Sequence, residues 1–147
     1  MNDRLDDTTL SHLTERYVAV WNEADPDARR KRIAELWAED GAQVLTDPPQ
    51  EIRAAAAGLA FPIPPLQVRG HRELDARVTR AYEMFVAPGE YVFQARATAT
   101  RLAANLIGLG WAMVATADGT EAGTGYDVLA LDETGRIRSD HQFIGPA

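Results

Sequence analysis

The spacing of hydrophobic positions changes halfway along the chain. In the first half they recur every three or four residues, and from about residue 9 the side chains of Leu10, Leu13, Tyr17 and Trp21 would share one face of an amphipathic helix. From residue 91 onward, apolar segments of strand length are separated by turn signals. Helices followed by strands predict an α+β domain in which three N-terminal helices pack on one face of a curved antiparallel sheet.

Capping and breaking residues set the expected boundaries. Asp25 is a favourable N-cap followed by Pro26, so a second helix should begin there and end at Gly41. A third helix is expected over 71–85, and strands over 43–46, 91–102, 105–117, 121–131 and 136–144. The proline-containing connection 50–69 is interpreted as a long loop, with two helical turns at its start, that could cover a pocket.

Composition limits the classes of function. The 147 residues are most simply one domain, 1–147, and the net charge of −7 argues against nucleic acid or an anionic membrane as the main partner. The basic run 29–32 is interpreted as a solvated helix face. The chain has no cysteine, its three histidines lie far apart, and no apolar stretch has membrane-spanning length. We therefore expect no metal site, no membrane span and a cytoplasmic location.

Three residues are candidates for chemistry, and each has a structural alternative. Asp127 lies within an apolar strand segment, where burying a charge is costly unless something compensates it, but it could simply tie a helix to the sheet. Asp47 ends the first predicted strand and could face a pocket, although Asp-Pro is also ordinary turn chemistry. Tyr17 could be a catalytic donor or a core tyrosine whose hydroxyl is satisfied.

Alternation along the last strand separates its polar residues into two sets. Asp140 and Gln142 share one face, and His141 lies on the other. The inferred pairing with the strand of Asp127 turns Asp140 and Gln142 toward the pocket and His141 away from it. Alternate glycines on two central strands are interpreted as bending the sheet or leaving volume for a bulky ligand; they are Gly108, Gly110, Gly123 and Gly125.

With these residues, the chain resembles the nuclear transport factor 2-like superfamily, especially its SnoaL-like and ketosteroid isomerase-like branches. The stretches that carry the resemblance are Leu36-Trp37-Ala38-Glu39-Asp40-Gly41, Thr46-Asp47-Pro48, Arg69-Gly70-His71, and Asp127 with Leu131-Asp132-Glu133-Thr134-Gly135-Arg136-Ile137. The resemblance implies a cone-shaped fold with an internal pocket. It does not specify an activity, because related folds carry many different chemistries.

The resemblance implies a role for each candidate. Asp47 matches the general base of the isomerases, Tyr17 their tyrosine donor, and Asp127 their carboxylic acid, which is kept neutral by an apolar site. Asp140, Gln142 and Trp37 are expected to contact the ligand. Because inward-facing Asp140 and Gln142 would make a steroid pocket too polar, we do not expect a steroid isomerase.

Two functions follow as hypotheses. The first is an acid–base enzyme without cofactor, of isomerase, dehydratase or hydrolase type, acting on a hydrophobic carbonyl-like compound. The alternative is a non-catalytic protein that binds a small hydrophobic or half-polar molecule. The resemblance also implies a homodimer through the outer face of the sheet, where we expect Ile107, Leu109, Trp111 and Met113.

Overall fold

A computed structural model describes residues 5–46 and 66–145 of the chain. The described elements are three α-helices followed or interrupted by strands, in the order α1 (Asp7–Asn22), α2 (Pro26–Leu36), β1 (Trp37–Thr46), β2 (Leu66–Arg69), α4 (Gly70–Ala81), β3 (Tyr91–Ala95), β4 (Thr100–Ala103), β5 (Leu106–Ala115), β6 (Glu121–Leu131) and β7 (Ile137–Gly145). A π-helical turn, Tyr82–Val86, continues α4. The predicted α+β class is confirmed, and none of the described helices is long and apolar enough to cross a membrane.

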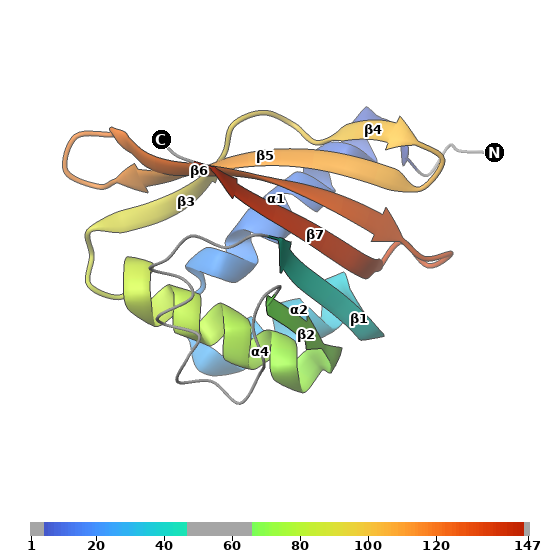
Figure 1. Ribbon diagram of the computed structural model, residues 1–147, viewed down its shortest axis with the longest axis horizontal. Coiled ribbons are helices and arrows are strands. Elements are labelled where there is room, and N and C mark those ends of the chain that lie inside the picture. Colours follow the sequence, from blue (N-terminus) through green and yellow to red (C-terminus); the bar gives the residue numbers. More distant parts are fainter. Residues whose placement is uncertain (1–4, 47–65, 146–147) are drawn as a thin grey trace.

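The strands form one mixed sheet in the order β2-β1-β7-β6-β5-β3, with β4 also paired to β5 (Figure 1). The predicted antiparallel sheet needs one correction, because β1 runs parallel to β7. The other strand pairs are antiparallel. Parallel partners come from distant parts of the chain, so local patterns do not reveal them.

All three helices contribute to one core with the sheet. Leu13 of α1, Ile33 of α2 and Leu74 of α4 pack in the same buried cluster as Ile107 and Leu129 of the central strands. The opposite face of the sheet exposes Tyr126 and Phe143 instead. The described helices therefore cover one side of the sheet and not the side that carries Tyr126 and Phe143.

Several predicted boundaries need correction. The second helix begins at Pro26 with Asp25 as its N-cap, as predicted, but it ends at Leu36 and not at Gly41. Trp37 to Gly41 belong to β1, where the pairing with β7 shifts between Trp37 and Ala42. A side chain at Gly41 would meet the carbonyl oxygen of Ile137 at 2.7 Å, so this glycine serves the close approach of two strands rather than a helix end.

The remaining differences concern the segments next to the central strands. Residues 66–69, predicted as part of a long connection, form strand β2, and the predicted strand 91–102 is divided into β3 and β4. The helical turns predicted at 50–57 and the suggested cover over the pocket lie outside the described residues.

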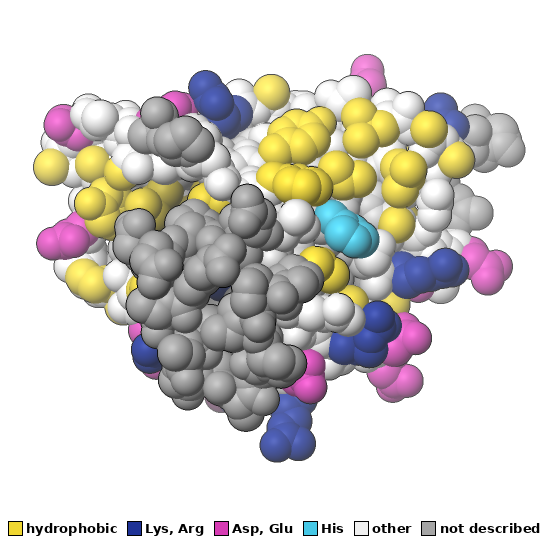
Figure 2. All heavy atoms as spheres, viewed as in Figure 1, with side chains coloured by type: hydrophobic (Ala, Val, Ile, Leu, Met, Phe, Trp, Pro, Cys, Tyr) yellow, Lys and Arg dark blue, Asp and Glu magenta, His cyan; other side chains and the backbone are white. Residues whose placement is uncertain are grey.

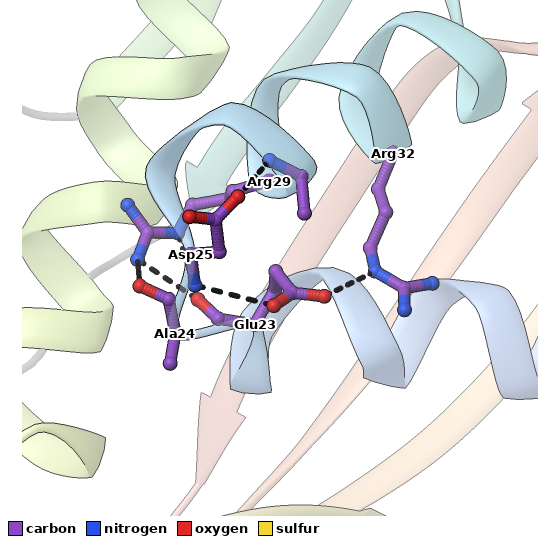
Figure 3. Close-up of polar contacts among 6 residues, drawn as sticks. Glu23, Ala24, Asp25, Arg29 and Arg32 are labelled. Atoms are coloured by element: carbon purple, nitrogen blue, oxygen red, sulfur yellow. Dashed lines mark hydrogen bonds and ion pairs between the residues drawn. The ribbon is translucent and has the colours of Figure 1, made fainter.

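The basic run 29–32 is not a uniformly solvated face. Arg29 is buried, and its guanidinium donates to the carbonyl oxygens of Glu23 and Ala24 (Figure 3) and to the hydroxyl of Thr79. Its guanidinium also lies over the ring of Tyr82, 4.7 Å from the ring centre. Arg32 remains at the surface and pairs with Glu23. The first arginine of the run thus joins the start of α2 to α4 and the turn that continues it.

The predicted outer face of β5 was also wrong. Ile107, Leu109 and Trp111 are buried on the inner face, against the helices. Gly108 and Gly110 lie on the outer face, where the ring of Tyr126 covers them, and a side chain at Gly108 would overlap the Tyr126 hydroxyl. Reversing the face requires only a one-residue change in the assumed register of the strand.

Candidate functional site

The candidate site lies where three neighbouring strands meet the first helix. Asp127 of β6 is paired in register with Gln142 of β7, and Leu129 with Asp140. Gln43 of β1 is the parallel neighbour of Asp140. All four polar side chains point to the buried face, and the carboxyl groups of Asp127 and Asp140 are 0% exposed. Strand alternation therefore brings two carboxyls and two amides to one position under the helices.

Tyr17 of α1 connects the two carboxyl groups. Its hydroxyl oxygen is 2.8 Å from Oδ2 of Asp127 and 2.7 Å from Oδ2 of Asp140. Tyr17 is itself buried, so the three groups meet away from solvent. Asp127 accepts a hydrogen bond from Tyr17 and so ties helix α1 to the sheet, which was the structural alternative to a chemical role for this residue.

The two short contacts of Tyr17 determine how many protons the cluster holds. A tyrosine hydroxyl has one hydrogen, so it can donate to only one carboxyl. The second contact is a hydrogen bond only if the other carboxyl is protonated and donates to the tyrosine oxygen. At least one of Asp127 and Asp140 is therefore in its neutral form when both contacts are made.

Asp127 has two further donors. Nε1 of Trp111 lies 2.6 Å from its Oδ1, and Nε2 of Gln142 lies 3.3 Å from each carboxyl oxygen. The amide of Gln142 is oriented by Arg77, whose Nη2 donates to Oε1 at 3.0 Å. Because arginine can only donate, the NH₂ end of this amide faces Asp127.

Asp140 has fewer donors. Besides its contact with Tyr17, Oδ2 lies 3.1 Å from Nε2 of Gln43, and Oδ1 has no partner in the described part of the chain. Burial raises the pKa of Asp140 well above its ordinary value, the charge of Asp127 raises it further, and hydrogen bonds from Tyr17 and Gln43 oppose the shift only in part. Burial likewise raises the pKa of Tyr17, with the two carboxyl charges acting in the same direction.

Arg77 is the buried cation of this region. Its guanidinium lies over the indole of Trp21, 5.4 Å from the ring centre, in a geometry that favours a cation–π interaction. Burial lowers the pKa of Arg77, and the groups that oppose this shift are Tyr17, Asp127 and Asp140. An arginine remains charged under these conditions, so its charge balances that of one ionised carboxyl.

Five buried polar atoms around the cluster have no hydrogen-bond partner among residues 5–46 and 66–145. They are Nε1 of Trp21, Nε1 of Trp37, Oε1 of Gln43, Nε of Arg77 and Oδ1 of Asp140. Buried polar groups are normally hydrogen-bonded, so each of these atoms is an exception. Three are donors and two are acceptors, and none is satisfied within the described residues.

The predicted site residues are brought together as far as they are described. Tyr17, Asp127, Asp140 and Gln142 form direct hydrogen bonds, and the ring of Trp37 packs beside Tyr17 with centres 5.8 Å apart. Asp47 lies outside the described residues. His141 is exposed on the face opposite Asp140.

A surface cleft of about 850 Å³ lies apart from this cluster. It runs between the start of α1 and the β6–β7 turn and is lined by residues such as Leu13, Arg16, Leu131 and Arg136. None of the described site residues lines it. The cleft is therefore not the pocket expected from the sequence.

Three members of the site were not identified from the sequence: Gln43, Arg77 and Trp111. Arg77 had a readable signal, because it falls among Leu74, Val78 and Ala81 on the apolar stripe of its helix. Gln43 has the strand parity of the buried Leu45. Trp111 was assigned to the outer face, and only the register that pairs it with Gly125 places it beside Asp127.

The chain is similar in fold to proteins described as SnoaL-like, cystatin-like and ketosteroid isomerase-like. Solved structures of these kinds match it with high probability, which confirms the resemblance and is consistent with the nuclear transport factor 2-like superfamily. No protein-family model matches the sequence, and a search of curated proteins found no match.

Three of the similar structures illustrate the range. A candidate isomerase of the SnoaL-like family from Agrobacterium tumefaciens is 25% identical, with a TM-score of 0.70, over 93% of this chain and 98% of that one. A SnoaL-like protein of unknown function from Burkholderia thailandensis is 15% identical, with a TM-score of 0.66, over 96% and 98%. A protein with a ketosteroid isomerase-like fold from Catenulispora acidiphila, solved with trimethylamine, is 17% identical, with a TM-score of 0.57, over 88% and 82%. The latter two establish likeness of fold alone.

Proposed function

We propose that this protein is a small-molecule enzyme whose acid–base centre is the buried cluster of Tyr17, Asp127 and Asp140. The observation that carries the proposal is the tyrosine hydroxyl within 2.8 Å of two carboxyl groups that are both 0% exposed. Such a cluster retains a proton on one carboxyl while the other is ionised. An acid and a base held side by side are what proton transfer to and from a substrate requires.

The surroundings favour a carbonyl-like compound of small size. Nε1 of Trp21, Nε1 of Trp37 and Nε of Arg77, which have no partner among the described residues, are donors whose hydrogen bonds an oxygen of the substrate could accept. Hydrogen-bond donors fixed in a water-poor site stabilise negative charge that develops on such an oxygen. The charge of Arg77 balances that of one carboxylate, which favours a substrate without net charge. The reaction type is an isomerisation, dehydration or hydrolysis.

Asp47 stays a prediction as the general base that first removes a proton from the substrate. Its role rests on the match to the isomerases and is independent of the hydrogen bonds of Tyr17. The Asp47→Asn variant separates the two parts of the proposal, since it removes the base without changing any residue of the described cluster.

Turnover of a chemically diverse panel tests the proposed function. The panel would contain β,γ-unsaturated ketones, epoxides, lactones and a nitrobenzisoxazole, whose ring opens when a base removes one proton. For any compound turned over, Tyr17→Phe, Asp140→Asn and Asp47→Asn should each lower kcat/KM by about 10²- to 10⁴-fold, the usual contribution of acid–base catalysis. Glu15→Gln, on the exposed side of the same helix as Tyr17, is the matched control and should retain activity. Unchanged turnover in all three variants would contradict the proposal.

The second candidate function is a binding protein without catalysis. It is favoured by the complete burial of both carboxyls and by the number of hydrogen bonds that Asp127 already makes within the protein. A small compound that survives purification, is identified by mass spectrometry and is released chemically unchanged would support this function. Failure of every compound in the panel to react would then be expected.

We also propose a homodimer through the outer face of the sheet. The residues on this face differ from those expected from the sequence. Tyr126 and Phe143 are paired across β6 and β7 and are 43% and 45% exposed. Figure 2 shows hydrophobic side chains gathered over these strands, with one histidine among them. An apolar patch of this kind on a sheet is typical of a protein–protein contact.

The dimer can be tested by light scattering after gel filtration. Phe143→Glu should convert a dimer into a monomer, because the charge would be buried without a partner in the contact. Leu102→Glu is the control, since Leu102 is 48% exposed on β4, which pairs with β5 and not with β6 or β7. A wild-type protein that is monomeric at all accessible concentrations would exclude the dimer.

A further inference from the structure

We infer that Trp111 and Gln142 are positioning residues that place the proton of the cluster on Asp140, and that Tyr17 relays this proton between Asp140 and Asp127. The use of this arrangement in catalysis rests on the proposed acid–base function. The experiment that tests the arrangement measures protonation and needs no substrate. It also reverses the roles expected from the isomerases, in which the residue matching Asp127 would be the neutral acid.

The hydrogen bonds around the two carboxyls are unequal. Oδ1 of Asp127 receives the indole N–H of Trp111 at 2.6 Å, and a tryptophan N–H can only donate. The amide of Gln142 adds a second donor at 3.3 Å, and Arg77 fixes the direction of this amide from behind. Donors that face a carboxyl favour its ionised form.

Asp140 lacks comparable support. Gln43 donates to Oδ2 at 3.1 Å, while Oδ1 has no partner in the described part of the chain. Its side chain is fully buried beside the charge of Asp127, which disfavours a second negative charge. Of the two carboxyls, Asp140 is therefore the one that keeps the proton.

The resting arrangement is a chain of two hydrogen bonds. Protonated Oδ2 of Asp140 donates to the oxygen of Tyr17, and the hydroxyl of Tyr17 donates to Oδ2 of ionised Asp127. When the proton moves, the Asp140 O–H bond breaks as a new Tyr17 O–H bond forms, and the original Tyr17 O–H bond breaks as Asp127 becomes protonated. Tyr17 begins and ends neutral, so its raised pKa does not impede the transfer.

A carboxyl titration of the wild-type protein tests the position of the proton directly. With carbon-13-labelled aspartate, the carboxyl signals of Asp127 and Asp140 can be followed by NMR from acid to alkaline pH. We expect the proton of the cluster to lie on Asp140 rather than on Asp127 at neutral pH. The reverse order, or two ionised carboxyls, would overturn the inference.

Variants test the positioning and relay roles separately. Trp111→Phe removes the shortest donor to Asp127, so the fraction of Asp140 that is protonated at neutral pH should fall as Asp127 takes a share of the proton. In a Tyr17→Phe background the same change should have a smaller effect on Asp140, because the tyrosine no longer links the two carboxyls and only their direct interaction remains. An equal shift with and without Tyr17 would show that Trp111 does not act through the tyrosine.

The outcome is separate from that of the proposed function. If the protein turns over no substrate but holds its proton on Asp140, this inference is supported and the proposed enzymatic function is not. If the protein is an active enzyme with its proton on Asp127, the enzymatic function is supported and this inference is contradicted. If a variant does not fold, as judged by circular dichroism, the wild-type titration alone still decides the position of the proton.

Discussion

Gly125→Ala should destabilise the protein by about 3 kcal/mol, the combined cost of overpacking and of a hydrogen bond lost from a buried carboxyl. Gly125 is paired with Trp111 across β5 and β6, and a methyl group at this position would overlap the carbon atoms of the indole ring. The indole must move, and its N–H then leaves Asp127. The free energy of unfolding in urea, measured at neutral pH, tests this expectation.

The same strand provides a matched control. Gly123 lies two residues earlier on the same face, and the nearest atom to an added methyl group there is Cε of Met113, at 3.9 Å. Gly123→Ala should therefore change stability by less than about 0.5 kcal/mol, as is usual where nothing is displaced. The double variant Gly125→Ala/Trp111→Phe should recover the packing cost but not the lost hydrogen bond. Equal stability of Gly125→Ala and the wild type would show that the indole does not lie over Gly125.

Asp140→Asn should make the protein more stable at neutral and alkaline pH. The pKa of Asp140 is raised in the folded state, so between its ordinary value of 3.8 and the raised value the folded protein binds more protons than the unfolded chain. Stability therefore falls as the pH rises through this window, by up to about 1.4 kcal/mol per pH unit. Asparagine cannot ionise but still has an N–H donor for Tyr17, so the variant avoids this loss.

The effect is best measured as the difference between variant and wild type at each pH. Other carboxyls act in the opposite direction in both proteins, because hydrogen bonds lower their pKa; Asp132, which accepts bonds from Thr134 and Arg136, is an example. Asp132→Asn is accordingly a control with the opposite pH dependence. It should lower the free energy of unfolding relative to wild type as the pH rises above the acidic range. A stability difference between Asp140→Asn and wild type that does not grow with pH would show that Asp140 ionises freely in the folded protein.

Much of the site was predictable because strand and helix periodicity decide which side chains share a face. Tyr17 lies on the apolar stripe of its helix, and Asp140 and Gln142 have the same parity on the last strand. Asp127 was recognisable as a charge within an apolar strand. These inferences needed only the local spacing of residues, and the structure places all four residues together.

The partners that set the chemistry of these residues could not be predicted in the same way. The faces of β5 were assigned the wrong way round because a one-residue change of register exchanges them, and this error hid Trp111. Arg77 was visible as an arginine on an apolar stripe, but its contact with Gln142 joins positions 65 residues apart. Long-range contacts of this kind depend on how elements pack and not on their local sequence.

The amino-acid sequence by itself determined the α+β class, the start of the second helix, and the inward orientation of Tyr17, Asp127, Asp140 and Gln142. These features follow from periodicity and capping, which act over a few neighbouring residues. Only the tertiary structure decided the parallel pairing of β1 with β7, the inner position of Trp111, and the hydrogen bonds that join one tyrosine to two carboxyls. The physical reason is that register and hydrogen-bond distance are properties of the packed chain, because each depends on segments that the sequence separates by many residues.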